Sequence, residues 1–376
     1  MKFTVNRTAF IKELNDVSRA ITSKTTIPVL TGLKLVAEAD GLTLTGSDAD
    51  ISIQTTLSIA DEAAALSIEK TGAIVLPARF FSDIVKQLPE QQMTIEIVAG
   101  FQTMITSGSA SFTINGLDAN SYPHLPEITA ANSVTIGADM LRQIISQTVI
   151  AVSNQESRPI LTGVHFSLNE KTFLAVATDS HRLAQRTETL STDNTSVADV
   201  IIPGKSLNEL AKMLENVEEV ELRITDNQVL FILGKTLFYS RLLEGNYPDT
   251  TRLIPKESDT LITFNATELL AAINRASLLS HESRNNVVKL LISESGAKIT
   301  GNSPDVGRVE EELHVKKQEG NELEISFNPD YMKDALRSFG NIDIEVSFTV
   351  PLRPFTLKPV DNGDSFIQLI TPVRTF

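Results

Sequence analysis

The segment Ala177-Thr-Asp-Ser-His-Arg-Leu183 brings Asp, Ser, His and Arg together in a chain of 376 residues. It lies downstream of Arg158-Pro-Ile-Leu-Thr-Gly163, and both segments have an earlier counterpart. Ile27-Pro-Val-Leu-Thr-Gly32 corresponds to the first, and Thr45-Gly-Ser-Asp48 corresponds to the beginning of the second. Because internal similarity is the signature of a repeated structural unit, the segment is either an active site or the specialised copy of a fold element.

Helix starts also recur. Three alternating runs each lead into an amphipathic pattern, which predicts a short strand followed by a helix: Lys2 to Phe10, Ser133 to Leu141 and Leu261 to Leu269. Asn265 followed by Glu268 resembles a capping box. Three further helices are predicted to begin at a proline in the first helical turn, at Pro77, Pro203 and Pro329.

The segments between these helices alternate with period 2, which predicts strands. Examples are Leu42 to Thr45, Met93 to Val98, Ser111 to Ile114, Val220 to Ile224 and Ile342 to Val346. Two proline-bounded linkers, Asn120-Ser-Tyr-Pro123 and Gly245-Asn-Tyr-Pro248, close the first two units. We therefore predict an α+β fold of three tandem similar domains, 1–127, 128–255 and 256–376, each with two helices packed on antiparallel sheets.

Composition narrows the class of protein. There is no cysteine, which excludes disulfides, thiolate zinc sites and a cysteine nucleophile. No apolar run reaches membrane-spanning length and the first residues lack the apolar core of a signal peptide, so we expect a cytoplasmic protein with no membrane partner. A formal net charge of −14 argues against a nucleic-acid binder unless the basic residues gather on one surface.

The predicted helices carry basic residues on faces away from their apolar stripes. In the second helix the predicted inward residues include Phe80, Phe81 and Ile84. Any one basic pair is typical of a solvated helix face, but the recurrence in an acidic protein favours a shared basic surface. Its candidates are Lys12 and Arg19, Arg79 and Lys86, Arg142, Lys205 and Lys212, Arg275, and Lys333 and Arg337.

The chemistry-bearing residues do not form a convincing catalytic site. Consecutive residues of a strand point to opposite faces, and no Gly-x-Ser-x-Gly turn surrounds Ser180, so a hydrolytic triad is disfavoured. Gly204-Lys-Ser206 and Gly234-Lys-Thr236 lack the upstream glycine of a phosphate-binding loop. The five histidines show no ligand spacing, so we expect no catalysis, metal site or cofactor.

The motifs quoted above, with Gly245-Asn-Tyr-Pro-Asp249 and the Pro372-Val-Arg374 tail, resemble the bacterial sliding-clamp family, the beta subunits of DNA polymerase III, over the whole length. The resemblance implies a non-catalytic processivity factor: two chains join head to tail in a ring through which duplex DNA passes. It also implies a clamp-loader ATPase that opens the ring, and replicative and repair polymerases and other proteins that dock through a short peptide. A ring holds DNA by topology, so weak phosphate contacts suffice.

The resemblance also implies site residues. DNA contacts would include Lys24, Gln155 and Lys205, and the ring interface would join Phe112 and Ile114 to Leu278 and Leu279. Deleting Arg374 and Phe376 together is expected to abolish binding of a partner peptide. The peptide pocket would consist of Arg158, Leu161, Thr178, His181, Arg182, Leu183, Pro248, Leu253, Asn328, Tyr331, Leu352, Pro354, Leu369, Thr371, Pro372, Val373 and Arg374.

Two alternatives remain at this point. The first is a hydrolase that uses Asp179, Ser180 or His181, for which loss of turnover in His181→Ala would be diagnostic. The second is a repeat scaffold that does not act on DNA. It leaves the recurrent basic faces unexplained, and it predicts that charge reversal at Lys12 and Lys205 has no effect on DNA retention.

Overall fold

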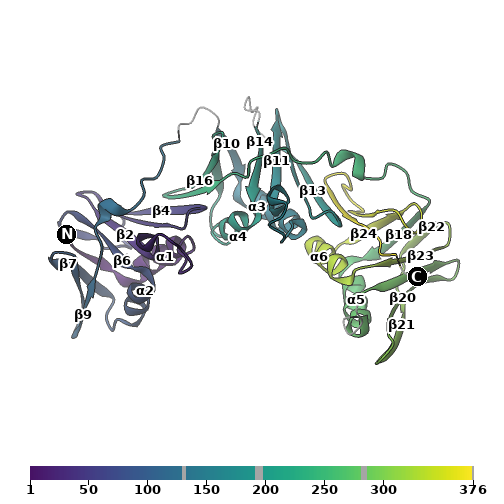
Figure 1. Ribbon diagram of the computed structural model, residues 1–376, viewed down its shortest axis with the longest axis horizontal. Coiled ribbons are helices and arrows are strands. Elements are labelled where there is room, and N and C mark those ends of the chain that lie inside the picture. The colour runs from purple at the N-terminus through teal and green to yellow at the C-terminus, as the bar shows by residue number, and fades with distance from the viewer. Residues whose placement is uncertain (129–132, 191–197, 281–285, 375–376) are drawn as a thin grey trace. The chain divides into compact units, whose positions relative to one another are not determined.

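The computed structural model describes residues 1–128, 133–190, 198–280 and 286–374 (Figure 1). Within these ranges the structure confirms the six predicted α-helices: α1 Arg7–Ser18, α2 Ala78–Gln87, α3 Ala138–Thr148, α4 Gly204–Ala211, α5 Ala266–Ser280 and α6 Pro329–Phe339. No helix of the described ranges is long and apolar enough to cross a membrane.

The strands form four sheets, and their neighbours pair antiparallel throughout. The five-stranded sheet is ordered β5 Ser67–Lys70, β1 Lys2–Asn6, β7 Gln92–Ala99, β8 Gln102–Ser107, β9 Ala110–Asn115. The eight-stranded sheet is ordered β10 Ser133–Gly137, β15 Glu219–Ile224, β16 Gln228–Leu233, β17 Thr236–Arg241, β4 Ile51–Ser58, β3 Gly41–Ser47, β2 Gly32–Ala37, β6 Gly72–Pro77.

The other two sheets repeat these orders. The nine-stranded sheet is ordered β14 Ala198–Pro203, β11 Gly163–Asn169, β12 Thr172–Thr178, β13 Arg182–Thr189, β26 Phe366–Ile370, β25 Phe355–Pro359, β24 Asp343–Phe348, β18 Thr260–Asn265, β22 Lys317–Gly320. The four-stranded sheet is ordered β21 Gly307–Leu313, β20 Gly296–Ser303, β19 Val288–Ser293, β23 Leu323–Phe327.

The strand orders show three copies of one plan. Strands β1-β7-β8-β9 correspond to β10-β15-β16-β17 and to β18-β24-β25-β26, and strands β6-β2-β3-β4 correspond to β14-β11-β12-β13 and to β23-β19-β20-β21. Each copy supplies two helices, and Figure 1 shows the pair α5 and α6 side by side in the third copy. The predicted α+β repeat architecture is confirmed.

The packing does not follow the three repeats, because two of the sheets cross from one repeat into the next. The chain forms two compact units, Met1–Asp139 with Lys212–Leu242 and Met140–Ala211 with Leu243–Phe376. The middle repeat thus contributes one sheet to each unit. The boundaries 1–127, 128–255 and 256–376 remain a prediction about the repeats.

Helix α1 packs as predicted, since Phe10, Leu14 and Val17 are fully buried. In α2 the prediction is wrong for one residue. Phe81 is fully buried, but the side chain of Phe80 is 66% exposed. Successive helix residues point about 100° apart, so two adjacent phenylalanines cannot both face one core.

Two details at helix starts also differ from the prediction. Pro77 and Pro203 are the last residues of β6 and β14, whereas Pro329 is the first residue of α6. Asn265 caps α5 by accepting from the N–H of Glu268 at 3.1 Å, but the Glu268 carboxylate bonds His314 at 3.0 Å. A proline suits both the last residue of a strand, as at Pro77 and Pro203, and the first residue of a helix, as at Pro329, because neither position requires an N–H donor.

Candidate functional site

The turn at Pro159–Thr162, upstream of Ala177–Leu183, is a fold element that also occurs in the first repeat. Pro28–Thr31 and Pro159–Thr162 are both single 3-10 turns, and the threonine hydroxyl of each donates to the proline carbonyl, at 2.8 and 2.7 Å. A threonine bonded to the backbone in this way stabilises a tight turn.

The Asp-containing turn repeats as well. Oδ1 of Asp48 accepts from two backbone N–H groups at 2.9 Å, and Oδ1 of Asp179 does so at 2.9 and 3.0 Å. The next residue has positive φ in both copies, 110° at Ala49 and 79° at Ser180. The aspartate therefore has a structural role, which is to hold the turn. The residue that follows it can be alanine or serine, so the turn does not depend on the Ser180 hydroxyl.

This geometry contradicts the hydrolase alternative. The second Asp179 oxygen is ion-paired with Arg182 at 3.0 Å, and the Ser180 hydroxyl accepts from Nη1 of Arg158 at 3.3 Å. The His181 ring stacks on Tyr331 with centroids 6.3 Å apart. In the part of the chain that the structure describes, no hydrogen bond joins His181 to Ser180, as a triad requires.

The same residues instead form the wall of a cavity of about 510 Å³. Five residues of the predicted peptide pocket line it together: Arg158, Leu161, His181, Arg182 and Tyr331. Gln155, predicted to contact DNA, lines it too. The segments that build it are the loop after α3, the β12–β13 turn and the first turn of α6.

Arg182 is held rigidly at this wall. Its Nε bonds Asp179 at 3.0 Å, its Nη1 bonds Asp334 at 2.7 Å, and its guanidinium lies 4.6 Å from the centre of the Tyr331 ring. Burial is the main cause that raises the pKa of Tyr331. Because charge-assisted bonds are directional, this arrangement fixes the tyrosine as a flat surface of the cavity.

Three residues next to the β12–β13 turn belong to a buried apolar cluster rather than to the cavity. Val176, Leu183 and Leu369 are buried together, and Tyr247 packs against them. The hydroxyl of Tyr247 accepts from the N–H of Thr178 at 3.0 Å, and burial raises the pKa of Tyr247 to about 12. The tyrosine is therefore neutral at ordinary pH and ties the Gly-Asn-Tyr-Pro linker to the Asp179 turn.

The C-terminal tail is bonded to the β12–β13 turn and to β23. The N–H of Thr371 donates to the carbonyl of His181 at 2.9 Å, and the N–H of Val373 donates to the carbonyl of Ser326 at 2.8 Å. Phe376 lies outside the described residues. Residues 371–374 are thus fixed as an extended segment beside the β12–β13 turn and β23.

The remaining pocket residues have separate places. Leu253 and Leu352 are 49% and 60% exposed, and Pro248 is also exposed. Asn328 caps α6 by accepting from the N–H of Asp330 at 2.8 Å, so it has a structural role. Pro354 and Pro372 are half-buried. The structure assigns none of these residues to the cavity.

The basic residues fall into two groups. Five exposed cations form no ion pair within the described ranges: Lys12, Lys24, Arg79, Lys86 and Lys205. Others are engaged with carboxylates: Arg275 with Glu311, Arg337 with Asp334, Arg19 with Asp16, and Lys333 with Asp330. Lys333 is also only 9% exposed, whereas Arg142 and Lys212 are exposed.

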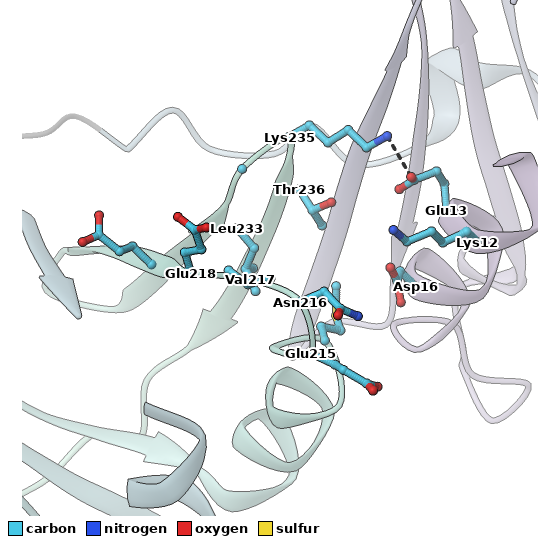
Figure 2. Close-up of a pocket in the computed structure, with 13 residues that line it drawn as sticks. Lys12, Glu13, Asp16, Glu215, Asn216, Val217, Glu218, Leu233, Lys235 and Thr236 are labelled. Atoms are coloured by element: carbon cyan, nitrogen blue, oxygen red, sulfur yellow. Dashed lines mark ion pairs between the residues drawn. The ribbon is translucent and has the colours of Figure 1, made fainter. Parts of the chain in front are cut away.

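A second cavity, of about 440 Å³, lies where β17 pairs with β4 (Figure 2). Lys235 reaches Glu13 of α1 at 2.8 Å, and the other Glu13 oxygen accepts from the Thr55 hydroxyl at 2.9 Å. Glu13 is only 4% exposed. Burial is the main cause that raises the pKa of Asp16, and Glu13 adds to the shift.

The sequence analysis missed this pair, although Glu13 sits beside Leu14 on the apolar side of α1. The carboxylate is buried because the neighbouring repeat supplies Lys235 to neutralise it, and the pair holds two repeats together. The sequence held one signal for this pair: Glu13 lies within the apolar stripe of the helix, and a charged residue is rarely buried unless an opposite charge pairs with it.

We expect Lys235→Met to destabilise the protein by about 1 kcal/mol, because Glu13 then stays buried without its counter-charge. The measurement is the midpoint of urea unfolding. Lys289→Met is the matched control: its lysine is similarly exposed, but its partner Glu324 is 58% exposed, so the change should be under about 0.5 kcal/mol. Equal shifts in the two variants would contradict the role of burial.

Comparisons with known proteins agree with the fold. Three profiles, DNA polymerase III beta subunit N-terminal, central and C-terminal domain, match residues 1–126, 135–249 and 251–374. The beta sliding clamps of Bacillus subtilis and Staphylococcus epidermidis are 49% and 44% identical to the chain, with full coverage of both chains.

Solved structures give the same result. The chain is similar to the crystal structure of the Bacillus subtilis DNA polymerase sliding clamp, with a TM-score of 0.96 at 48% identity. It is also similar to the DNA polymerase III beta chain of Streptococcus pneumoniae, with a TM-score of 0.97 at 43% identity, and both matches cover each chain fully.

The strand orders and the repeated turns together define an α+β protein built from three similar repeats. The chain belongs to the DNA polymerase III beta subunit family, the bacterial beta sliding clamps. It is a processivity factor without catalytic activity of its own, and DNA and polymerase are its partners. Membership of this family overturns both the hydrolase and the DNA-independent scaffold.

Proposed function

We propose that two copies of this chain close head to tail into a ring around duplex DNA, and that partner proteins dock a short peptide in the cavity beside Tyr331. The observation that carries the ring is a missing joint. Two joints between repeats are made within the chain, by β17 with β4 and by β26 with β13. The third equivalent pair, β9 and β21, is not made among the described residues.

The missing joint has a defined register. In the two existing joints Phe238 lies opposite Ile53, and Gln368 lies opposite Ala184. The residue of β9 at the equivalent position is Phe112, and the residue of β21 is Val309. Two open edges that match each other can pair only with a second copy, and a head-to-tail contact that closes gives a ring.

The side chains along these edges support the same conclusion. Phe112 is 40% exposed and Ile114 is half-buried on β9. Leu278 is 69% exposed at the end of α5, next to the half-buried Leu279, and α5 contacts β21. Apolar residues left at the edge of a sheet indicate an interface, so these four residues form our proposed contact between chains.

For DNA we propose contacts through Lys12, Lys24, Arg79, Lys86 and Lys205, because these cations are exposed and free of ion pairs within the described ranges. A cation not committed to a carboxylate can neutralise a phosphate without first breaking a bond. Arg142 and Lys212 are further candidates because they are exposed, while Arg275, Arg337, Arg19 and Lys333 are weaker candidates because carboxylates engage them. Gln155 fits the docking cavity better than DNA.

For partner docking we propose a peptide with an apolar anchor. The cavity combines the apolar surface of Leu161 and Tyr331 with the charge of Arg158. Apolar anchors give affinity and a few polar groups set orientation. Replicative and repair polymerases and a clamp-loader ATPase that opens the ring are the proposed users of the site, in the bacterial cytoplasm.

The absence of cysteine from the sequence allows a direct test of the ring. In the double variant Phe112→Cys, Val309→Cys, the two thiols come from opposed positions of paired strands, where Cβ atoms lie about 4.5–5.5 Å apart. We expect mild oxidation to give a covalent dimer that stays on circular DNA in detergent and is lost when the DNA is linearised.

The control shifts the register by one residue. Thr113→Cys with Val309→Cys places the two thiols on opposite faces of the sheet, so it should cross-link poorly. Equal cross-linking of both double variants would contradict the proposed register. Equal loss of the covalent dimer from circular and linear DNA would contradict the ring.

A further inference from the structure

Phe80 is a large aromatic residue that lies outside the buried core, at the rim of a cavity of about 460 Å³ beside the end of α1. It is the third residue of α2, its side chain is 66% exposed, and the adjacent Phe81 is fully buried. A single exposed apolar residue is ordinary on a protein surface, so exposure alone implies nothing. The role of Phe80 is inferred from the residue at the equivalent helix position in the third repeat.

In the third repeat that position is occupied by Tyr331, the third residue of α6, which is followed by the buried Met332. Tyr331 packs against the β12–β13 turn of the preceding repeat: its ring stacks on His181 at 6.3 Å, and Arg182 lies 4.6 Å from its centre. This contact accompanies the pairing of β26 with β13. An aromatic at the third helical position is thus part of a joint between repeats.

The counterpart of the β12–β13 turn in the third repeat is the β20–β21 turn. His181 is the last residue before β13, and Val306 is the last residue before β21. Val306 is 60% exposed. The place of Arg182, the first residue of β13, is taken by Gly307, which has no side chain, so a contact here would be wholly apolar.

We infer that Phe80 of one chain packs against Val306 of a second copy, beside the pairing of β9 with β21. This inference rests on the proposed ring and adds a specific contact to it. An aromatic and an aliphatic side chain, each left mostly exposed at equivalent positions of one joint, remove each other from water when the joint forms. Since no charge is involved, we expect high salt not to weaken this contact.

The test is a charge exchange. Phe80→Lys and Val306→Glu each place a charge against an apolar surface, so each should weaken dimerisation about tenfold per joint. A head-to-tail ring contains the joint twice, which gives about a hundredfold in the dimer dissociation constant. In the double variant the introduced ammonium and carboxylate groups face each other, so this variant should regain at least about tenfold over either single variant.

Dissociation constants are measured by sedimentation and by subunit exchange between fluorescently labelled rings. Ile59→Lys and Val360→Glu are the controls, because Ile59 and Val360 are exposed to similar extents, 50% and 53%, at positions outside this turn and α2. They should leave the dissociation constant within about twofold. Circular dichroism and the urea midpoint establish that each variant is folded.

The outcomes separate this inference from the ring itself. Additive effects in the double variant, or single variants that dimerise like the wild type, overturn the contact while leaving the ring in place. A wild-type protein that is monomeric overturns the ring. If Phe80→Lys changes DNA retention while the dissociation constant of the dimer is unchanged, Phe80 faces DNA and the inference is wrong.

Discussion

A Phe112→Asp variant should be monomeric at concentrations where the wild type forms rings. Position 112 faces Val309 of the second copy in the proposed register, and β21 continues with Glu310, Glu311 and Glu312. The substitution removes the apolar contact and adds a carboxylate to an acidic edge, at a cost of about 2 kcal/mol per joint. With two joints in a ring, dimer affinity should fall about a thousandfold.

Sedimentation equilibrium measures this loss, and retention on circular DNA should disappear with it. Phe112→Lys is the matched control, because it removes the same aromatic ring but places a cation opposite the glutamates. It should weaken the dimer less than Phe112→Asp does. If the aspartate variant forms rings with wild-type affinity, β9 is not the edge that joins the chains.

Deleting residues 372–376 should lower the affinity for a polymerase-derived docking peptide by at least about a hundredfold and leave the dimer intact. The deletion removes the Val373 bond to Ser326 and the charge of Arg374, while Thr371 keeps its bond to His181. The loss is expected to be large because the tail is bonded to the β12–β13 turn, whose His181 lines the cavity, and a docked peptide would contact both.

Fluorescence anisotropy of a labelled peptide measures the affinity, and sedimentation confirms the dimer. Two substitutions at Tyr331 measure the contribution of the cavity separately from that of the tail. Tyr331→Ala should weaken binding about tenfold or more, and Tyr331→Phe should bind like the wild type. Undiminished binding by the truncated ring would show that the peptide docks elsewhere.

Sequence patterns predicted the helices and strands of this fold better than they predicted which strands pair with each other. Period 2 marked Val220 to Ile224 as a strand, because one-sided burial leaves a local trace. It also marked Ser111 to Ile114 as a strand, although the described chain buries neither face of β9. It could not show that β17 pairs with β4, since the two strands are far apart in the chain and their backbone bonds leave no mark on composition.

The side-chain predictions failed where tertiary contacts decide. Helical periodicity placed both Phe80 and Phe81 inward, but one core can accept only one of two adjacent residues. Lys333 was assigned to a basic face, and it is buried beside Asp330. In contrast, the dismissal of a triad at Ser180 was correct, although its premise of strand geometry was wrong. Asp179, Ser180 and His181 form the turn between β12 and β13, where Ser180 has a φ of 79°.

The joints between repeats have a consequence for the smallest subunit that could form a ring. One joint sets Thr236 against Thr55 and the other sets Phe366 against Arg186, so the two joints share backbone pairing rather than side chains. Every repeat carries one edge of each kind. A single repeat therefore carries both edges that a closed ring of identical subunits requires, and in this chain peptide linkers connect repeats that strand pairing also joins.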